Sequence, residues 1–457
     1  MSFPRYPEYK DSGVEWLGVV PAHWTVTPLK WLTTRISSGK TPLGGNETYV
    51  NEGILFLRSQ NVYDDGLRLD DVAYITSAVD ASMAVSRVRA HDILLNITGA
   101  SIGRTCVVPP NLPPANVNQH VCVVRIERAD YIQFCGWFLK CDPVKQQIDF
   151  AQDGAAREGL TFEQIGGFCA ALPKPDECAL IAAFLDRETA KIDALVAEQE
   201  TLIALLKEKR QAVISHAVTK GLNPDAPMKP SGIEWLGDVP AHWEVIALGR
   251  ISIDKCDGPF GSGLKSEHYV DEGARVIRLQ NIKGGYFDDR DAVFVDLTYF
   301  ETEMAGHDVR CGDVLIAGLG DDKNTVGRAC VAPIGIAPAM VKADCFRFRP
   351  DTDRVLAEFV AWALTTGSGF DAGVLSSGST RSRIPLSVMA SRKIALPPRS
   401  EQHEIVRVLA IRNQEFDLLI AEAEDAMDIL KERRSALISA AVTGQIDVRG
   451  LVPASAA

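Results

Sequence analysis

Two stretches of the chain carry apolar residues three and four positions apart over an unusual length. They run from about residue 178 to 219 and from 401 to 443, and neither contains glycine or proline. This spacing is that of one face of an α-helix, so each stretch predicts a single long helix. A helix of about 40 residues would extend roughly 60 Å, which is too long for one domain of this size to cover.

The apolar positions of both stretches also recur at heptad spacing, which is typical of helices that pair along a seam. The residues predicted to form this seam are Leu185, Ile192, Leu195, Leu202, Leu206, Val213, Leu409, Phe416, Leu419, Leu430 and Leu437. Further apolar residues, among them Val196 and Ile203, widen the first stripe, so another partner is expected. The alternative is that each helix packs only on its own globular domain.

Outside these stretches the apolar runs are short, end at glycine and occur twice. "SGVEWLGVVPAHW" at 12–24 returns as "SGIEWLGDVPAHW" at 231–243, and "VRAHDILLN" with "GRTCVV" (88–96, 103–108) returns as "VRCGDVLIA" with "GRACVA" (309–317, 327–332). Such runs are typical of strands. A displacement of about 220 residues is far longer than a solenoid repeat, so a whole domain is copied. The sequence predicts an α/β (α+β) fold in which a globular domain followed by a long helix occurs twice, as a pseudo-dimer in one chain.

Composition narrows the class of protein. The chain has 457 residues, 46% of them hydrophobic, and no apolar run approaches the roughly 18 residues of a membrane span, so we expect a cytoplasmic protein without membrane contact. Its ten cysteines form no C-x-x-C pair, which favours reduced thiols over a zinc site or disulfides. The net charge of -12 argues against indiscriminate coating of nucleic acid, although a locally basic loop could still face a duplex.

The motifs that could indicate catalysis are incomplete. "SGKT" at 38–41 resembles a phosphate-binding loop, but Thr34 stands where its first glycine should be and Pro42 where the helix should begin. In "GPFGSGLKS" at 258–266, Leu264 separates the glycine from Lys265. His23 and His242 repeat without a carboxylate at catalytic spacing, so we interpret them as structural. The pattern predicts a chain that is not an enzyme.

An ordered series of motifs nevertheless points to a family. "SGxEWLGxVPAHW", "LRSQN", "AREGLTFEQI", "LPxPxE" and the helix from "FLDRETAKIDALV" to "SHAVTKGL" resemble the specificity subunit of Type I restriction-modification systems. The match spans nearly the whole chain, twice. The heptad register is uneven, since Ala423, Ala426 and Ala440 stand where the first helix has Gln199, Leu202 and His216.

The resemblance implies a non-catalytic subunit that reads a split DNA target, with two pseudo-symmetric target recognition domains separated by two long antiparallel coiled-coil helices. It implies a first target recognition domain at 1–171, a central long helix at 172–222, a second target recognition domain at 223–395, a C-terminal long helix at 396–445 and a flexible tail at 446–457. The implied partners are double-stranded DNA with a bipartite target, two modification subunits, which bind S-adenosylmethionine and methylate adenine, and restriction subunits, which use ATP and Mg. No cofactor and no metal is expected in this chain.

Candidate DNA contacts follow from the alignment of the two copies. Arginines are contributed by the aligned loops before the long helices and by the two Gly-Arg turns. The "LRSQN" and "RLQN" motifs contribute polar side chains, and the divergent loop before the second Gly-Arg turn contributes a lysine and an asparagine. These residues are Arg58, Gln60, Asn61, Arg104, Arg157, Arg278, Gln280, Asn281, Lys323, Asn324, Arg328, Arg381 and Arg383. Residues shared by both copies favour phosphate-binding or structural roles, whereas specificity is expected where the copies differ, at 96–102 and 318–325.

Two other functions compete with this interpretation. A duplicated scaffold would bind two identical protein partners and no DNA, and sequence-selective binding in the presence of partners separates it from a specificity subunit. A nuclease or methyltransferase acting alone would show activity as a purified single chain with cofactor and metal.

Overall fold

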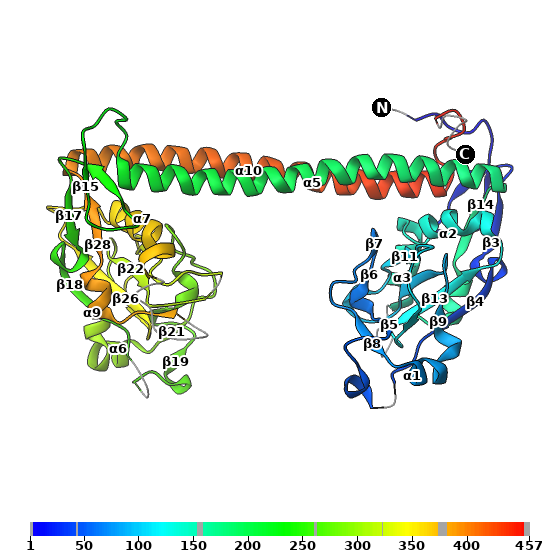
Figure 1. Ribbon diagram of the computed structural model, residues 1–457, viewed down its shortest axis with the longest axis horizontal. Coiled ribbons are helices and arrows are strands. Elements are labelled where there is room, and N and C mark those ends of the chain that lie inside the picture. Colours follow the sequence, from blue (N-terminus) through cyan, green and yellow to red (C-terminus); the bar gives the residue numbers. More distant parts are fainter. Residues whose placement is uncertain are drawn as a thin grey trace. The chain divides into compact units, whose positions relative to one another are not determined.

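The computed structural model describes residues 3–42, 44–152, 159–259, 263–321, 323–372 and 382–451. The chain forms two compact units, here called unit 1 (Met1–Glu200 with Glu424–Ala457) and unit 2 (Thr201–Ala423). The two predicted long helices are confirmed as α5 (Pro175–Lys220) and α10 (Arg399–Val442) (Figure 1). Each unit therefore contains one globular part and a portion of each long helix.

The globular part of unit 1 is built on two four-stranded sheets. The first has the order β11 (Thr105–Val107), β10 (Ile93–Asn96), β13 (Val121–Ile126), β4 (Thr33–Ser38), and all its pairs are antiparallel. The second has the order β8 (Ala73–Ile75), β5 (Ile54–Leu57), β12 (Ala115–Val117), β9 (Arg87–Val88), with a parallel pair between β5 and β12. All four residues of β10 are buried, because both faces of the strand are covered: Ile93 and Leu95 belong to one apolar cluster and Leu94 to another.

Unit 2 repeats the strand order of the first sheet and of three strands of the second. Its first sheet has the order β18 (Ser252–Asp257), β26 (Cys345–Pro350), β22 (Val314–Ala317), β24 (Ala329–Val331). Its second has the order β19 (Tyr269–Val270), β21 (Phe294–Val295), β20 (Ala274–Ile277), β25 (Ala339–Val341), again with one parallel pair, β20 with β25. The duplication predicted from the sequence is thus present in the sheets, and the α/β (α+β) fold class is confirmed.

Short hairpins and helices complete each unit. In unit 1 these are β1 (Tyr9–Asp11), β2 (Val19–Pro21), β3 (Thr25–Pro28), β6 (Val62–Tyr63), β7 (Gly66–Leu67), β14 (Cys169–Leu172), α1 (Ser77–Ser82), α2 (Ile132–Phe138), α3 (Asp142–Gln152) and α4 (Phe162–Gly167). In unit 2 they are β15 (Met228–Pro230), β16 (Asp238–Pro240), β17 (Glu244–Ala247), β23 (Leu319–Gly320), β27 (Ser382–Arg383), β28 (Lys393–Leu396), α6 (Leu297–Glu303), α7 (Ala357–Gly367) and α9 (Leu386–Ser391).

The two long helices pair within each unit and run in opposite directions. Arg434 of α10 binds Asp193 of α5 in unit 1, with Nε 2.8 Å from Oδ1, and Arg210 of α5 binds Asp417 of α10 in unit 2. Among the residues predicted for the seam, Leu185, Ile192, Leu409, Phe416 and Leu437 are buried. Leu206, Val213 and Leu430 are half-buried, the latter two against the cores of their units.

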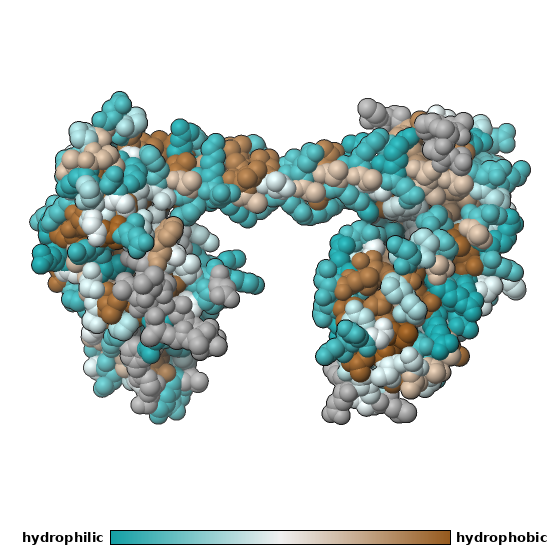
Figure 2. Space-filling model, in the orientation of Figure 1, coloured by the Kyte–Doolittle hydropathy of each residue, from teal (hydrophilic) through white to brown (hydrophobic). Residues whose placement is uncertain are grey.

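Three residues predicted for the seam are exposed instead, and the prediction is wrong for them. Leu195, Leu202 and Leu419 are 42–46% exposed, and apolar surface is visible along the helices (Figure 2). Between residues 189 and 213, the less exposed positions of α5 are 189, 192, 196, 199, 203, 206, 210 and 213, a regular alternation of three and four residues. This seam passes through Thr189, Gln199 and Arg210, so a search for apolar residues alone shifts onto the neighbouring leucines.

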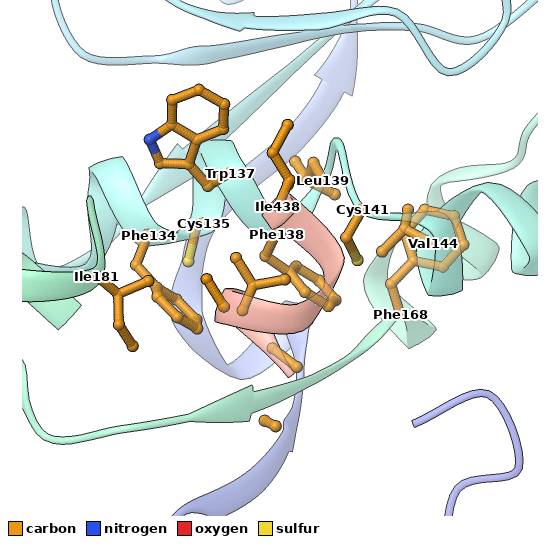
Figure 3. Packing of buried hydrophobic residues seen from close by; sticks show 14 of the residues in the cluster. Phe134, Cys135, Trp137, Phe138, Leu139, Cys141, Val144, Phe168, Ile181 and Ile438 are labelled. Carbon is orange, nitrogen blue, oxygen red and sulfur yellow. The ribbon is translucent and has the colours of Figure 1, made fainter. Parts of the chain in front are cut away.

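The core of unit 1 joins the globular part to both long helices. Phe134 and Phe138 of α2 are fully buried, and Ile181 of α5 and Ile438 of α10 belong to the same cluster (Figure 3). In unit 2, Phe359 of α7 shares a cluster with Leu409 of α10. Because large side chains from helix and sheet interdigitate, the attachment of each helix to its globular part is hydrophobic.

A repeated polar contact fixes the start of each long helix. Glu177 in the first turn of α5 accepts hydrogen bonds from Trp24 Nε1 (3.2 Å) and Tyr6 Oη (2.7 Å), and lies 3.0 Å from His23 Nε2. Glu401 of α10 makes the same contacts with Trp243 Nε1 (3.1 Å) and His242 Nε2 (2.8 Å). The "PAHW" motif therefore binds a carboxylate near the N-terminus of each helix, where negative charge is favourable.

One glycine in each of the two apparent phosphate-binding loops has a structural role. A Cβ on Gly39 would lie 1.7 Å from the carbonyl oxygen of Val117, and one on Gly258 would lie 2.0 Å from the carbonyl carbon of Lys342. Both positions require glycine because another segment of backbone passes directly beside them.

Candidate nucleic-acid interface

The segments that differ between the repeats come together at one end of the first sheet of unit 1. Asn96 at the end of β10 pairs with Val121 at the start of β13, so the loop after β10 and residues 118–120 leave the sheet side by side. Thr98 of this loop forms a β-bridge with Gly159, and Thr98 Oγ1 lies 2.6 Å from His120 Nδ1. We call residues 97–103, 118–120 and 159 the variable edge of unit 1.

The same three segments meet in unit 2 with different residues. Ala317 pairs with Cys345, Leu319 pairs with Arg383, and Arg383 Nε donates a hydrogen bond of 2.7 Å to Asp344 Oδ1. The variable edge of unit 2 is residues 318–321, 323–327, 342–344 and 382–383. In sequence, Asp344 and Arg383 align with His120 and Gly159 at the same displacement of 224.

A glycine ends the loop on both edges. Gly103 and Gly327 have φ angles of +86° and +82°, which side chains with a Cβ rarely adopt. Their amides donate to the carbonyl oxygens of Asn96 (2.9 Å) and Ala317 (2.7 Å). The return of the chain is therefore common to both units, while the loop tip is free to vary in length and chemistry.

In unit 2 the loop tip holds two predicted DNA contacts in a fixed turn. Asp321 Oδ1 accepts hydrogen bonds from the backbone amides of Lys323 (2.9 Å) and Asn324 (2.7 Å), and these amides hold the pKa of Asp321 below its ordinary value. The side chain of Lys323 is exposed, and that of Asn324 is half-buried. The turn thus presents a cation on the loop that continues from β23, the strand paired with Arg383.

The Arg-x-Gln-Asn motifs form a closed loop structure in both units. Asn61 is 2% exposed, accepts from the amide of Arg58 (2.9 Å) and donates to the carbonyl oxygen of Arg68 (2.8 Å). Asn281 is 1% exposed and makes the equivalent contacts with Arg278 (2.9 Å) and Asp288 (2.9 Å). A buried amide with these bonds cannot read a base edge without unfolding the loop. We therefore interpret both asparagines as structural residues.

The arginine and glutamine of each motif are turned to a neighbouring aspartate. Gln60 Nε2 donates to Asp71 Oδ2 (2.7 Å), and Arg58 Nη2 donates to the Asp71 carbonyl oxygen (3.1 Å). In unit 2 the partner of Gln280 (3.4 Å) and Arg278 is Asp291. These four side chains remain partly accessible beside the loop.

The two Gly-Arg arginines, aligned in sequence, occupy different environments. The guanidinium of Arg104 lies over the ring of Tyr63, 4.7 Å from its centre, and the side chain is half-buried. Arg328 is 7% exposed and donates to the carbonyl oxygens of Leu279, Ile282 and Thr325 at 2.8–3.0 Å, with longer bonds to Leu319 and Asn324. Burial lowers the pKa of Arg328. The structure contradicts a direct DNA contact by Arg328, because its donors are directed at backbone.

Arg157 and Arg381 lie outside the described residues. Their neighbours Gly159 and Arg383 are described and lie in the variable edges. The DNA contacts of Arg157 and Arg381 stay predictions. Sequence reasoning missed Gln119 and His120, although they lie in a divergent stretch, "NVNQH" against "MVKAD", that could have signalled them.

Among the described residues, three or more His, Cys, Asp or Glu side chains are nowhere grouped as metal ligands would be. Within the same residues, no helix is long and apolar enough to cross a membrane. Cys106, Cys122 and Cys135 are buried thiols, and burial raises the pKa of each to about 12.

Known proteins resemble this chain over nearly its whole length. No family model matches it. The specificity subunit of the Type I restriction enzyme EcoKI of Escherichia coli (strain K12) is 21% identical over 438 residues, which cover 94% of this chain and 90% of that protein. The StySPI specificity subunit of Salmonella potsdam is 20% identical over 443 residues, with the same coverage of each chain.

This chain is similar to Type I specificity subunits over nearly its whole length. Solved structures agree in fold. A chain from work on complex assembly and conformational transition of the type I R-M system has a TM-score of 0.63 at 18% identity and covers 95% of this chain and 99% of its own. The HsdS subunit from Thermoanaerobacter tengcongensis has a TM-score of 0.50 at 17% identity, covering 93% and 98%. The resemblance predicted from the sequence is confirmed, and the Type I specificity-subunit fold includes the two repeats and both long helices.

Proposed function

We propose that this chain is the specificity subunit of a Type I restriction-modification complex. Each globular part reads one half of a split DNA target, and the chain itself catalyses no reaction. The observation that carries this proposal is that two units with the same sheets and the same Gly-Arg turns differ at the variable edge. Reading two different half-sites requires two domains with the same sheets and different variable edges. Contacts to phosphate, which position a protein on DNA, can be shared, whereas contacts to bases, which specify the sequence, must differ.

DNA contacts are assigned to accessible residues at or beside the variable edges. In unit 2 these are Lys323, Asn324 and Arg383, and in unit 1 Arg104. Arg157 and Arg381, which lie outside the described residues, are retained from the sequence alone. Arginine suits either role, since its planar fork bonds guanine or clamps phosphate. Arg58, Gln60, Arg278 and Gln280 flank the edges and are proposed as phosphate contacts.

The long helices are proposed to dock two modification subunits and to set the distance between half-sites. Support comes from apolar side chains that the chain leaves uncovered in unit 2: Leu202, Leu205, Leu418 and Leu419 are 42–61% exposed. A groove of about 740 Å³ between α5 and α10 is lined by Leu206, Val213, Leu409 and Phe416 among others. Exposed apolar surface on a helix pair is typical of a protein interface.

The chemistry of the complex is assigned to these partners. The modification subunits would carry S-adenosylmethionine and methylate adenine, and restriction subunits, where present, would use ATP and Mg to cleave DNA. The compartment follows from the target, since a chain that reads DNA inside a prokaryotic cell works in the cytoplasm.

Base-resolution mapping of methyladenine tests the proposal. Cells carrying this chain with a cognate modification subunit are compared with cells lacking only this chain. The expected result is a split motif whose methylation depends on the chain. Assembly of the complex without chain-dependent methylation would refute the proposal and favour a scaffold.

A further inference from the structure

A chain of hydrogen bonds at the variable edge of unit 1 holds an exposed glutamine in place. Gln119 Nε2 lies 2.9 Å from His120 Nε2, and His120 Nδ1 lies 2.6 Å from Thr98 Oγ1. His120 and Thr98 are half-buried, whereas the side chain of Gln119 is exposed. The exposed end of this hydrogen-bonded series is thus the amide of Gln119, and the imidazole and the hydroxyl are the less exposed groups.

The chemistry of these groups fixes the direction of each bond. An amide nitrogen can only donate, so Nε2 of His120 accepts from Gln119 and the imidazole proton is on Nδ1, which donates to Thr98. Gln119 then keeps its amide oxygen and a second N–H for a ligand. The orientation of the imidazole is set from both sides.

The backbone beneath this chain is itself held in place. Asn118 is 8% exposed, and its Oδ1 accepts from the amide of His120 (3.0 Å). The carbonyl oxygen of His120 accepts from the amide of Ile97 (3.0 Å), which ties the segment to the loop after β10. Such support reduces the entropy that a side chain loses when it binds.

Unit 2 has a different group at the equivalent place. Ala343 aligns with Gln119, and Asp344 aligns with His120 but bonds Arg383 instead of a hydroxyl. An oriented amide in one unit therefore corresponds to an oriented guanidinium in the other. This is the kind of difference expected between two domains that read different bases.

We propose that Gln119 reads an adenine in the half-site bound by unit 1, and that His120 and Thr98 are positioning residues for it. The inference rests on the proposed function. An amide that offers one donor and one acceptor side by side matches the N6 amino group and N7 of adenine in the major groove. Asparagine and glutamine are the residues that use this pairing.

The test is the same methylome map, made with Gln119→Ala and Gln119→Glu. Gln119→Ala is expected to reduce discrimination at one position of one half-site by about ten- to a hundredfold, the effect of losing a bidentate base contact. The other half-site should be unchanged. Gln119→Glu replaces the donor with an acceptor, so preference at that position should move toward cytosine, which donates from N4.

Gln133→Ala, at an exposed glutamine of α2 in the same unit, is the matched control and should leave the motif unchanged. A complete, unrelaxed motif with Gln119→Ala would overturn the inference and leave the proposed function standing. Loss of methylation at every site by both Gln119 variants, with an unchanged unfolding temperature, would overturn it too, since a reader of one base relaxes one position. Absence of chain-dependent methylation with the unchanged chain would refute the proposed function and this inference together.

Discussion

Each unit has a hydrogen bond from a side chain to an equivalent backbone carbonyl, but the side chain that donates differs between units 1 and 2. In unit 1 the carbonyl oxygen of Ser59 accepts from Asn96 Nδ2 (2.8 Å). In unit 2 the aligned carbonyl, of Leu279, accepts from Arg328 Nη2 (2.9 Å). Asn96 has no amide counterpart in unit 2, because Ala317 aligns with it. Both units therefore contain this hydrogen bond to the carbonyl, but a different residue donates it in each.

This exchange changes what the aligned arginine can do. In unit 1 Asn96 makes the hydrogen bond to this carbonyl, so Arg104 does not have to make it. Arg104 lies over Tyr63 instead. The counterpart of Tyr63 in unit 2 is Lys283. Arg328 in contrast is committed to backbone carbonyls. Arg104 and Arg328, which align in sequence, therefore differ in how far their side chains are available for contact with DNA.

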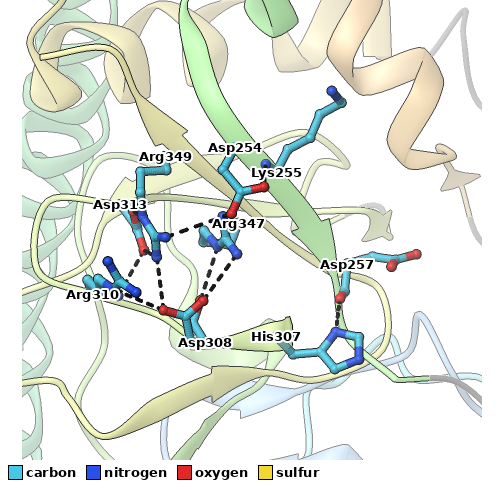
Figure 4. A network of polar contacts seen from close by, with 9 residues as sticks. All are labelled: Asp254, Lys255, Asp257, His307, Asp308, Arg310, Asp313, Arg347 and Arg349. Carbon is cyan, nitrogen blue, oxygen red and sulfur yellow. Dashed lines mark hydrogen bonds and ion pairs between the residues drawn. The ribbon is translucent and has the colours of Figure 1, made fainter. Parts of the chain in front are cut away.

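The first sheets differ in a second way. Both contain a bidentate pair, Arg125 with Asp92 in unit 1 and Arg349 with Asp313 in unit 2. Unit 2 adds Arg347, which is 1% exposed, where unit 1 has Val123 (Figure 4). Its Nη1 donates to Asp254 Oδ2 (2.6 Å), and Nη2 lies 3.3 Å from Asp308 Oδ1.

Replacing the two aligned arginines should give the largest difference. Arg328→Ala leaves several buried carbonyl oxygens without a donor and is expected to lower the free energy of unfolding by about 2–4 kcal/mol. Arg104→Ala removes a cation–π contact at a half-buried site and should cost about 1 kcal/mol or less. Urea denaturation of the full chain measures both. Equal losses would show that the two arginines are equivalent after all.

Asn96→Ala should have an intermediate effect in unit 1. The Ser59 carbonyl oxygen loses its donor, but Oδ1 of Asn96 has no partner in the described part of the chain, so removing it offsets part of the loss. We expect destabilisation of about 1 kcal/mol, measured by the same urea denaturation. Asn111→Ala, at an exposed asparagine, is the control and should stay within about 0.5 kcal/mol of the unchanged chain. A loss as large as that of Arg328→Ala would contradict the unequal roles of the two side chains.

Much of the fold could be predicted because it is repeated and periodic. The spacing of apolar residues gave both long helices nearly to their ends, and the copied motifs predicted two globular parts of one design. Local patterns of this kind are visible in the sequence since neighbouring residues form them. The helix seam was predicted less well, because its less exposed positions include Thr189 and Arg210, which a search for apolar residues passes over.

Contacts between distant residues could not be predicted in the same way. The carboxylate that binds His23 is 154 residues away, and the one that binds His242 is 159 away, so both histidines lacked a partner in the sequence. The sequence also did not show that Asn61 and Asn281 are buried. Their polarity suggested a ligand, whereas the fold uses both amides to close a loop.

The ion-pair network of unit 2 should give the smallest difference, and acid should reveal it. The hydrogen bond from Arg347 holds the pKa of Asp254 below its ordinary value of about 3.9. A carboxylate with a depressed pKa in the folded state adds stability above that ordinary value and loses it as pH falls through the folded pKa. Since the side chain of Asp254 is 54% exposed, solvent screens the pair and the loss should be less than about 1 kcal/mol.

Hydrogen exchange of the full chain, corrected for intrinsic rates, can compare the two units at about pH 6 and pH 3. Amides of β18 and β26 should lose slightly more protection in acid than those of β4 and β13, where Val123 replaces Arg347 and the Asp254 pair has no counterpart. Asp254→Asn should remove that excess, because an amide does not titrate in this range. If β18 and β26 lose no more protection than β4 and β13, or if Asp254→Asn leaves the excess in place, the extra ion pairs of unit 2 do not make it more sensitive to acid.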